Sequence, residues 1–238
     1  MKEGNIIKYQ EKVLRLLSGR LEGFYLAGGT ALSLYYFHHR GSLDLDFFTP
    51  TFNMVAVQNI VDELAAKMGK KIQLITQQNK KNLIKIAVYM IKLRPKESLK
   101  IDFVEDFLKT IKLPKLINGI AVLSLEDIYL RKVYAISGSI EVIDEIGRKV
   151  AAGGRQEAKD FFDLYCLSTI LMPLSKFAYK YCDSVHKEAL VRWFRSYDRM
   201  AIKTGLLELK TNKDIDYRLM ESHFKKEIDK LIEKEVGI

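Results

Sequence analysis

The sequence predicts an α+β fold, with a mixed sheet and flanking helices over residues 1–118 and an all-helical region over residues 119–238. Two observations support this expectation. Before Pro114, short runs rich in Ile, Leu and Val alternate with helical patterns, whereas helical spacing of apolar residues dominates after it. A chain of 238 residues is also long enough to bury two small cores. We therefore expect an α/β domain followed by a helical domain.

The first 70 residues can be divided by their apolar spacing and by the glycine and proline residues that end each pattern. Apolar residues keep helical spacing after Asn5 and stop at Gly19, and a later helical pattern closes at Gly69. The expected elements, in chain order, are a helix over 5–19, a strand over 24–27, a helix from 31 towards 38, a strand over 43–48 and a helix over 54–67.

Three further strands are expected before Pro114, because apolar runs there are separated by polar or basic turns. These strands cover residues 71–77, 83–91 and 99–104, and a last short strand is expected at 120–122. From Ser124 to the C-terminus the pattern predicts helices, with interruptions near residues 138, 153, 173 and 211.

Composition excludes several classes of protein. Hydrophobic residues make up 48% and charged residues 29% of the chain, which excludes disorder, collagen-like repeats and a coiled coil as descriptions of the whole chain. Cys166 and Cys182 form no CxxC motif and lie in apolar surroundings, so we expect buried free thiols in a reducing compartment. No apolar run suits a signal peptide or a membrane span, which predicts a cytoplasmic protein with no membrane partner.

The chain is basic, with 39 Lys and Arg residues against 30 Asp and Glu residues and a formal net charge of +9. Residues 67–115 carry 13 basic and 4 acidic residues, so this segment accounts for the whole surplus. Concentrated positive charge favours a polyanionic partner. We expect the turns at Lys70-Lys71 and Lys80-Lys81, together with Lys85, to guide an anionic acceptor. The alternative is that the surplus only aids solubility.

The residues most informative about chemistry are Asp44 and Asp46 in the predicted strand. Alternate side chains of a strand share a face, so these two carboxylates point one way while Leu45 and Phe47 point the other way. Aspartate is disfavoured in strands, which argues against two merely solvated side chains. Paired carboxylates supply the oxygen ligands that Mg²⁺ or Mn²⁺ prefers.

A third carboxylate supports a cation site. Alternation in the strand over 99–104 places Asp102 and Lys100 on the face opposite its apolar residues. If this strand lies beside that of Asp44 and Asp46, the three carboxylates could hold two ions about 4 Å apart. An isolated aspartate at a strand end is the alternative interpretation of Asp102.

The turn Gly28-Gly29-Thr30 follows a predicted strand and opens a predicted helix. Glycines allow the backbone to approach a phosphate closely, and the first turn of a helix offers N–H groups to an anion. This signal is weak by itself, because Gly-Gly turns are common. It gains weight from the aspartate pair that follows.

Together these motifs resemble the nucleotidyltransferase superfamily, specifically the AbiEii/AbiGii toxin family. The similarity spans about residues 24–170. The residues that carry it are Gly28-Gly29-Thr30, His39-Arg40, Asp44-Leu45-Asp46-Phe47-Phe48, Ser124-Leu125-Glu126-Asp127, Lys132, Arg155, Lys159-Asp160 and Asp163-Leu164. The resemblance implies a nucleotidyltransferase-like mixed sheet.

The resemblance also implies roles for individual residues. Nucleotide phosphates would bind at Gly28, Gly29 and Thr30, and the catalytic metal would be held by Asp44, Asp46 and Asp102. Of the residues further along the chain, Lys132 and Asp163 would contact the nucleotide and complete the catalytic site, and Lys159 and Asp160 would help to bind the nucleotide; these four form a distal set.

The residues of this distal set also allow plainer interpretations. Lys132 falls on an apolar helical stripe with Ile128 and Ile136, so its side chain could extend to the edge of that surface. Lys159 and Asp163 are four residues apart and could form an ordinary helical ion pair.

The expected function is a metal-dependent transfer of a nucleoside monophosphate from an NTP to an acceptor. The resemblance implies Mg²⁺ (or Mn²⁺) as cofactor, the toxin role in a bacterial toxin–antitoxin or phage-defence pair, a cognate antitoxin as partner, and RNA such as a tRNA 3′ end as acceptor. One alternative is a small-molecule transferase of the aminoglycoside-modifying type, which an acidic acceptor cleft would favour. Another is a catalytically silent module that binds nucleotide or RNA, which would bind Mg²⁺-NTP without turnover.

Overall fold

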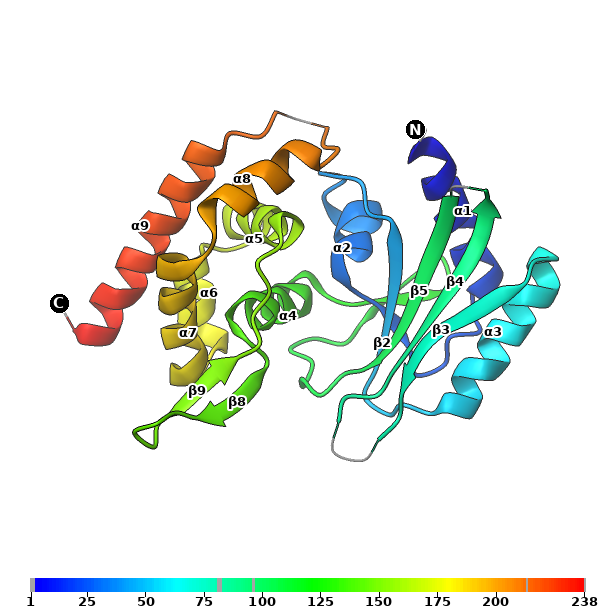
Figure 1. The fold of residues 1–238 in the computed structure, drawn as a ribbon, viewed down its shortest axis with the longest axis horizontal. Coiled ribbons are helices and arrows are strands. Elements are labelled where there is room, and N and C mark those ends of the chain that lie inside the picture. Colours follow the sequence, from blue (N-terminus) through cyan, green and yellow to red (C-terminus); the bar gives the residue numbers. More distant parts are fainter. Residues whose placement is uncertain (1–2, 81–82, 96, 213, 238) are drawn as a thin grey trace. The chain divides into compact units, whose positions relative to one another are not determined.

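The computed structural model describes residues 3–80, 83–95, 97–212 and 214–237. The chain divides into two compact units (Figure 1). The first unit comprises Met1–Tyr36 and Gly41–Ser124, and the second comprises Phe37–Arg40 and Leu125–Ile238. The first unit therefore extends past residue 118. That the two parts fold as separate domains stays a prediction.

The first unit is built on a seven-stranded mixed sheet with the strand order β3-β4-β5-β2-β1-β7-β6. Pairs β2/β5 and β1/β7 are parallel, and the other pairs are antiparallel. The strands are β1 (Tyr25–Leu26), β2 (Asp44–Thr49), β3 (Ile72–Gln78), β4 (Ile86–Arg94), β5 (Glu97–Glu105), β6 (Lys115–Ile117) and β7 (Ile120–Val122). Each of these strands except β6 is predicted by the sequence, and β6 is only three residues long.

Helices of the first unit begin and end near the predicted residues. α1 (Glu3–Leu17) packs against α3 (Met54–Met68) and against β5. α3 ends at Gly69, whose φ of 61° is left-handed, as the glycine predicted. Between β1 and β2, α2 (Gly28–Ala31) continues directly into the π-helical turn η1 (Leu32–Tyr36).

The core of the first unit lies under the alternating strands β2 and β5. Exposure alternates along β2, so Leu45 and Phe47 are buried while Asp44 and Asp46 face outward. Beneath the sheet, the Phe103 ring lies 5.4 Å from that of Phe24 and 5.5 Å from that of Phe47, measured between centroids. This apolar cluster fixes which side chains of both strands remain on the open face.

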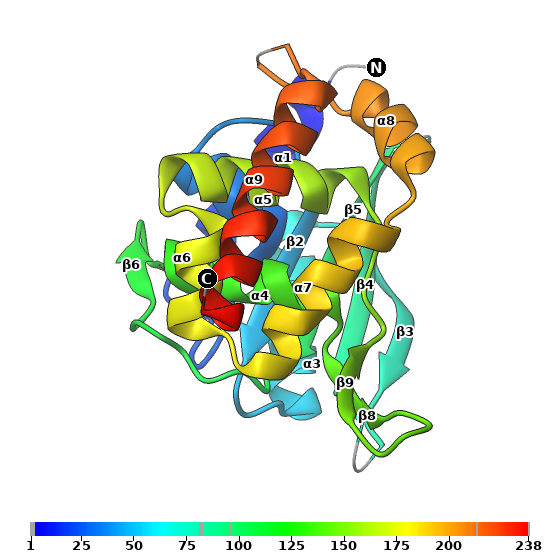
Figure 2. The same ribbon diagram turned by 90° about the vertical axis from the view of Figure 1, so that its left-hand side faces the viewer.

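The second unit is mainly helical, and its helices α6, α7 and α9 pack side by side (Figure 2). Phe161 lies at the centre of an aromatic core with Trp193 and Phe224, at centroid distances of 5.9 and 4.8 Å. The helices are α4 (Leu125–Ser137), α5 (Ala158–Ile170), α6 (Leu174–Tyr181), α7 (Ser184–Ser196), α8 (Arg199–Glu208) and α9 (Tyr217–Val236).

The description of residues 119–238 as all-helical omits a hairpin. β8 (Ile140–Ile143) and β9 (Lys149–Ala152) form a two-stranded antiparallel sheet between α4 and α5. Segments of four residues, such as Ile140–Ile143 and Lys149–Ala152, fit a strand or a helix equally well by spacing alone. Gly138 and Gly154 flank the hairpin, and a Cβ on Gly154 would lie 2.2 Å from the carbonyl oxygen of Ile136. These glycines therefore allow the close backbone approach that closes the hairpin.

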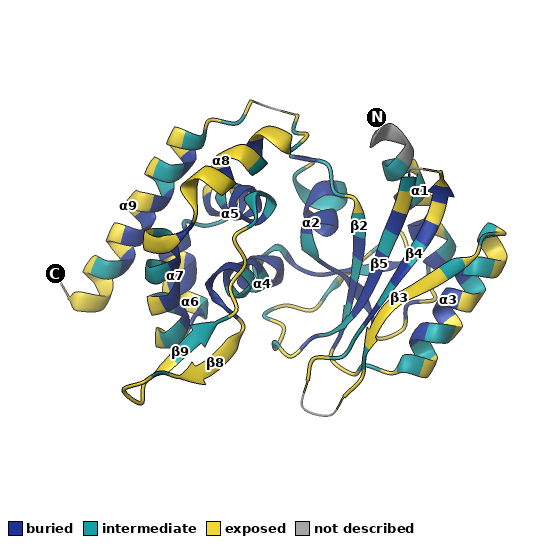
Figure 3. Ribbon diagram, viewed as in Figure 1, coloured by how far each residue is buried: buried dark blue, intermediate teal, exposed yellow. Residues whose placement is uncertain are grey.

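The outermost strand β3 is exposed along most of its length (Figure 3).

In the part of the chain that the structure describes, no single helix is both long and apolar enough to cross a bilayer, although α5 and α6 meet that test as a pair bent by 91°.

Phe103→Ala should destabilise the first unit, because it removes the ring that contacts Phe24, Phe47 and Tyr89 in the core. We expect a loss of about 3–5 kcal/mol in the free energy of unfolding. Phe107→Ala is the matched control, since Phe107 is 52% exposed. Urea unfolding followed by circular dichroism measures both, and equal losses would contradict this account of the core.

Candidate active site

Asp44 and Asp46 on β2 and Lys100 and Asp102 on β5 form one group, here called the acidic strand cluster. β2 and β5 pair in parallel, with Asp46 opposite Asp102 and Asp44 opposite Lys100. The prediction that these strands are neighbours is confirmed. Side chains opposite each other on one sheet face are within contact distance, so the three carboxylates and the ammonium group are held together by backbone pairing.

Lys100 contacts the carboxylates on both strands. Its Nζ lies 2.9 Å from Asp102 Oδ2 and 3.6 Å from Asp44 Oδ2. Burial opposes the charge of Lys100, but the hydrogen bond to Asp102 and the charges of Asp102, Asp44 and Asp46 outweigh it and raise the lysine's pKa. The sequence predicts that Lys100 lies on this face. It does not predict the contact with Asp44, because that contact depends on which strands are neighbours in the sheet.

Gly28 lies directly against the carboxylate of Asp46. Its φ is +68°, and a Cβ built there would lie 2.5 Å from Asp46 Oδ2. Beside it, the Ala27 N–H donates a hydrogen bond of 2.9 Å to the Asp46 carbonyl oxygen. Any side chain at position 28 would displace the carboxylate, so the glycine is required by both conformation and space.

The segment that enters β2 is held by hydrogen bonds from two helices. The hydroxyl of Thr30 lies 2.8 Å from Ser42 Oγ and also contacts the carbonyl oxygen of Asp44. Gln10 Nε2 donates to the carbonyl oxygens of Ser42 and Asp44, at 2.9 and 3.1 Å. Thr30 is fully buried and Gly29 is buried. Nucleotide binding by Gly28, Gly29 and Thr30 stays a prediction.

Gln10 is a buried contact that sequence reasoning missed. It is fully buried on α1, yet its neighbours Glu11 and Lys12 are exposed and polar. No local pattern distinguishes it from them, because its partners lie more than thirty residues away.

The donor set of the acidic strand cluster suits a hard cation such as Mg²⁺. No group of three or more His, Cys, Asp or Glu side chains is arranged as a ready metal site within the described residues. Mg²⁺ commonly uses only one or two protein carboxylates together with substrate phosphates and water. Asp44 and Asp46 meet that requirement, and the Asp46 carboxylate lies directly against the main chain of Gly28.

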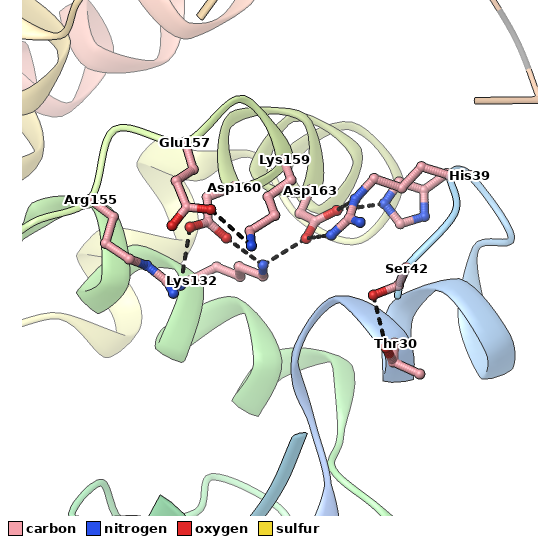
Figure 4. Close-up of polar contacts among 10 residues, drawn as sticks. Thr30, His39, Ser42, Lys132, Arg155, Glu157, Lys159, Asp160 and Asp163 are labelled. Atoms are coloured by element: carbon pink, nitrogen blue, oxygen red, sulfur yellow. Dashed lines mark hydrogen bonds and ion pairs between the residues drawn. The ribbon is translucent and has the colours of Figure 1, made fainter. Parts of the chain in front are cut away.

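The second unit contains a buried ion cluster, consisting of His39, Arg40, Lys132, Asp160 and Asp163 (Figure 4). Arg40 forms a bidentate pair with Asp163, with Nε–Oδ1 at 2.6 Å and Nη2–Oδ2 at 2.7 Å. His39 Nε2 lies 2.7 Å from Asp163 Oδ1. Lys132 Nζ lies 2.6 Å from Asp160 Oδ1 and 2.7 Å from Asp163 Oδ2.

Charge pairing within this cluster overcomes the cost of burial. Burial favours the neutral form of Asp163, yet the charges of Lys132 and Arg40 and the hydrogen bonds from His39 and Arg40 hold its pKa well below the ordinary value. Burial likewise opposes charge on Lys132, whereas Asp163 and Asp160 raise the pKa of that lysine. Asp163 and Lys132 are therefore both charged at neutral pH.

The main chain of residues 38–40 is also held within the second unit. Asn212 Nδ2 donates to the carbonyl oxygen of His38 at 2.5 Å, and Arg40 forms a β-bridge with Thr211. His38 has a φ of +50°, an uncommon value for a residue with a side chain. His39 and Arg40, which the sequence places near the acidic motif, are thus anchored to Asp163 on α5.

Lys132 and Lys159 differ in how they are placed. Lys132 is only 6% exposed, so the interpretation that its side chain extends to the surface is wrong. Lys159 is partly exposed and pairs with Glu157 at 2.8 Å, whereas Asp163 pairs with other residues (Figure 4). Arg155 Nη2 lies 3.0 Å from Asp160 Oδ2. Catalytic or nucleotide-binding roles for Lys132, Lys159, Asp160 and Asp163 stay predictions.

Asp163→Asn should destabilise the second unit, because it leaves Arg40 and Lys132 buried with too little negative charge. We expect a loss of about 3–5 kcal/mol at pH 7. The lowered pKa of Asp163 stabilises the folded state above the unfolded value of about 4, and this contribution is lost as the pH falls towards the folded value. The gap between wild type and variant should therefore narrow below about pH 4.

Urea unfolding at several pH values measures this gap. Lys159→Gln is the control, since an exposed pair contributes less than about 1 kcal/mol. A gap that stays constant with pH would contradict the assigned ionisation of Asp163.

Comparison with known proteins gives the same fold and a family. Two solved structures from Helicobacter pylori are similar to this chain. A candidate nucleotidyltransferase is 19% identical with a TM-score of 0.57, and the match covers 95% of this chain and 96% of that chain. JHP933 is 20% identical with a TM-score of 0.57, and the match covers 96% of this chain and 94% of that chain. At these identities the likeness shows the nucleotidyltransferase-like fold alone.

No curated protein sequence matches the chain. A family model does match, over residues 14–236, and its description is "Nucleotidyl transferase AbiEii toxin, Type IV TA system". That match covers nearly the whole chain. The chain therefore belongs to the AbiEii nucleotidyl transferase toxin family of type IV toxin–antitoxin systems.

Proposed function

We propose that this toxin transfers a nucleoside monophosphate from an NTP to an RNA acceptor in a reaction that depends on Mg²⁺ or Mn²⁺. One observation carries the proposal. The parallel, in-register pairing of β2 and β5 brings Asp44, Asp46 and Asp102 together on one sheet face, and the absence of a side chain at Gly28 lets the Asp46 carboxylate lie directly against the main chain. Oxygen ligands beside a glycine at a helix start are suited to a metal-bound triphosphate.

Each residue of the site has a distinct role in this proposal. Asp44 and Asp46 would hold the metal ion, which when bound withdraws negative charge from the phosphates. The main chain at Gly28 and Gly29 would approach the phosphates. The acceptor hydroxyl would form the new bond to the α-phosphorus and give its proton to Asp102, and pyrophosphate would leave as the bond to its bridging oxygen breaks.

The basic segment supports an anionic acceptor such as the 3′ end of a tRNA. Lys71 and Lys80 are exposed at the two ends of β3, which is itself exposed on both faces. Lys85 differs from them, because it pairs with Glu105 at 2.8 Å. Lys81 lies outside the described residues. Exposed lysines beside an open strand can track a nucleic-acid backbone.

The buried ion cluster has a supporting role in this proposal. Asp160 and Asp163 are fully buried and form ion pairs with Lys132 and Arg40. We infer that the main role of these groups is to maintain the fold of the second unit. Direct contact of Lys132, Lys159, Asp160 or Asp163 with the nucleotide remains a prediction that substrate-bound structures can test. Membership of a type IV toxin–antitoxin family implies a partner antitoxin, and we place the reaction in the cytoplasm, where NTPs and RNA are found.

Asp46→Asn should abolish transfer without unfolding the protein. The substitution keeps the shape of the side chain beside Gly28 but removes a metal-binding charge, so we expect a loss of at least about 10²-fold in rate. Each radiolabelled NTP is incubated with the protein, Mg²⁺ and total cellular RNA, and label on RNA is measured. Asp62→Asn, an exposed aspartate on α3, is the control and should transfer like the wild type.

The outcomes of this experiment separate the candidate functions. Label on RNA with wild type and with Asp62→Asn, but not with Asp46→Asn, supports the proposal. Label on an aminoglycoside-type small molecule instead of RNA would show that the acceptor is a small molecule. Tight Mg²⁺-NTP binding with no transfer to any acceptor would indicate a silent binding module.

Neutralising Lys71 and Lys80 together, as Lys71→Gln and Lys80→Gln, should weaken RNA modification and its dependence on salt. Each lost phosphate contact lowers the slope of log affinity against log salt by about 0.7. RNA binding between low and high salt measures the slope, and NTP binding without RNA is the control that should not change. An unchanged slope of log affinity against log salt would contradict RNA binding by these lysines and would favour a role of the basic residues in solubility.

A further inference from the structure

Lys100 lies against the carboxylates of the acidic strand cluster, of which the proposed function assigns Asp44 and Asp46 to a metal and Asp102 to the acceptor proton. Its Nζ is 2.9 Å from Asp102 Oδ2 and 3.6 Å from Asp44 Oδ2, and Asp46 adds a further favourable charge interaction. The lysine side chain is 35% exposed. Backbone register places it there, since its Cα is paired with that of Asp44.

The charges of the acidic strand cluster favour one divalent ion rather than two. Asp44, Asp46 and Asp102 carry three negative charges when ionised, and Lys100 carries one positive charge. One divalent ion therefore brings the formal charge of the cluster to zero. In the protein without nucleotide, a second divalent ion would leave an excess of positive charge and would lie beside an ammonium group, where like charges repel.

We propose that the Lys100 ammonium takes the position of a second metal ion, so that the acidic strand cluster binds a single divalent cation. This inference rests on the proposed function and concerns the composition of the same site. Lys100 is then a positioning residue, which holds the Asp102 carboxylate towards the acceptor side of the site and compensates its charge. It replaces the arrangement of three carboxylates and two ions that the sequence alone suggests.

A plainer account is that Lys100 forms an ordinary cross-strand ion pair. Such pairs contribute about 0.2–1 kcal/mol to a sheet and have no effect on the number of metal ions bound. The two accounts therefore differ in metal binding, and they do so without any need for substrate.

The test is the titration of purified protein with Mn²⁺ alone, followed by the electron paramagnetic resonance signal of free Mn²⁺. Wild type should bind one equivalent. Lys100→Gln should bind a second equivalent, or bind the first at least about tenfold more tightly, because the competing ammonium is gone. Lys100→Arg should behave like the wild type. Lys92→Gln, an exposed lysine on the neighbouring strand β4, should also do so.

Lys100→Met repeats the test with a side chain of similar length, and circular dichroism reports whether each variant is folded. Equal Mn²⁺ binding by wild type, Lys100→Gln and Lys100→Met would overturn the inference. So would two bound equivalents in the wild type, or no Mn²⁺ binding by the Lys100 variants.

The same proteins separate this inference from the proposed function. Mn²⁺ titration uses neither NTP nor RNA. A wild type that transfers nothing would contradict the proposed function, whereas the number of Mn²⁺ equivalents bound by each protein would still test the role of Lys100. Conversely, the wild type could label RNA while the Lys100 variants bind Mn²⁺ as the wild type does. That result would contradict the role of Lys100 alone.

Discussion

The parallel pairing of β2 with β5 is the constraint on which the rest of the site depends. It pairs residues that are more than fifty positions apart in the sequence, and its register decides which side chains meet. A shift of one residue would turn Asp46 into the core and bring Phe47 to the open face. The stacking of Phe47 on Phe103, at 5.5 Å between centroids, opposes such a shift. Apolar packing beneath the sheet thus determines the chemistry available above it.

A second constraint acts where the chain passes from one compact unit to the other. Residues 37–40 belong to the helical unit, yet Gly41 returns to the sheet unit only three residues before Asp44. Arg40 is fixed by a bidentate pair with a fully buried carboxylate. Buried ion pairs add little net stability compared with apolar packing, but a missing partner is costly. Such a cluster therefore specifies one position for this segment more than it strengthens the fold.

Sequence patterns predicted the features that depend on neighbouring residues. Alternation placed Asp44 and Asp46 on one face, and Gly69 located the C-terminal end of α3. The helix expected from residue 31 begins earlier, at Gly28. Sequence patterns did not predict the features that depend on residues far apart in the chain. The burial of Lys132 requires two acids from another helix, Gln10 is used by a loop far along the chain, and the short strands of the β8–β9 hairpin have no distinctive spacing. The family resemblance supplied the fold where local patterns could not.

Strand β3 closes one side of the seven-stranded sheet, and its outer edge has a consequence for self-association. A long, flat, apolar edge is a template on which a further strand from another molecule can add. Here the ladder to β4 is irregular between Leu74 and Thr76, and such a bulge bends and twists the strand. Lysines stand at both ends and Gln and Thr occupy most of its second half. The edge is therefore a poor template for sheet extension, although it is the most open strand of the sheet unit.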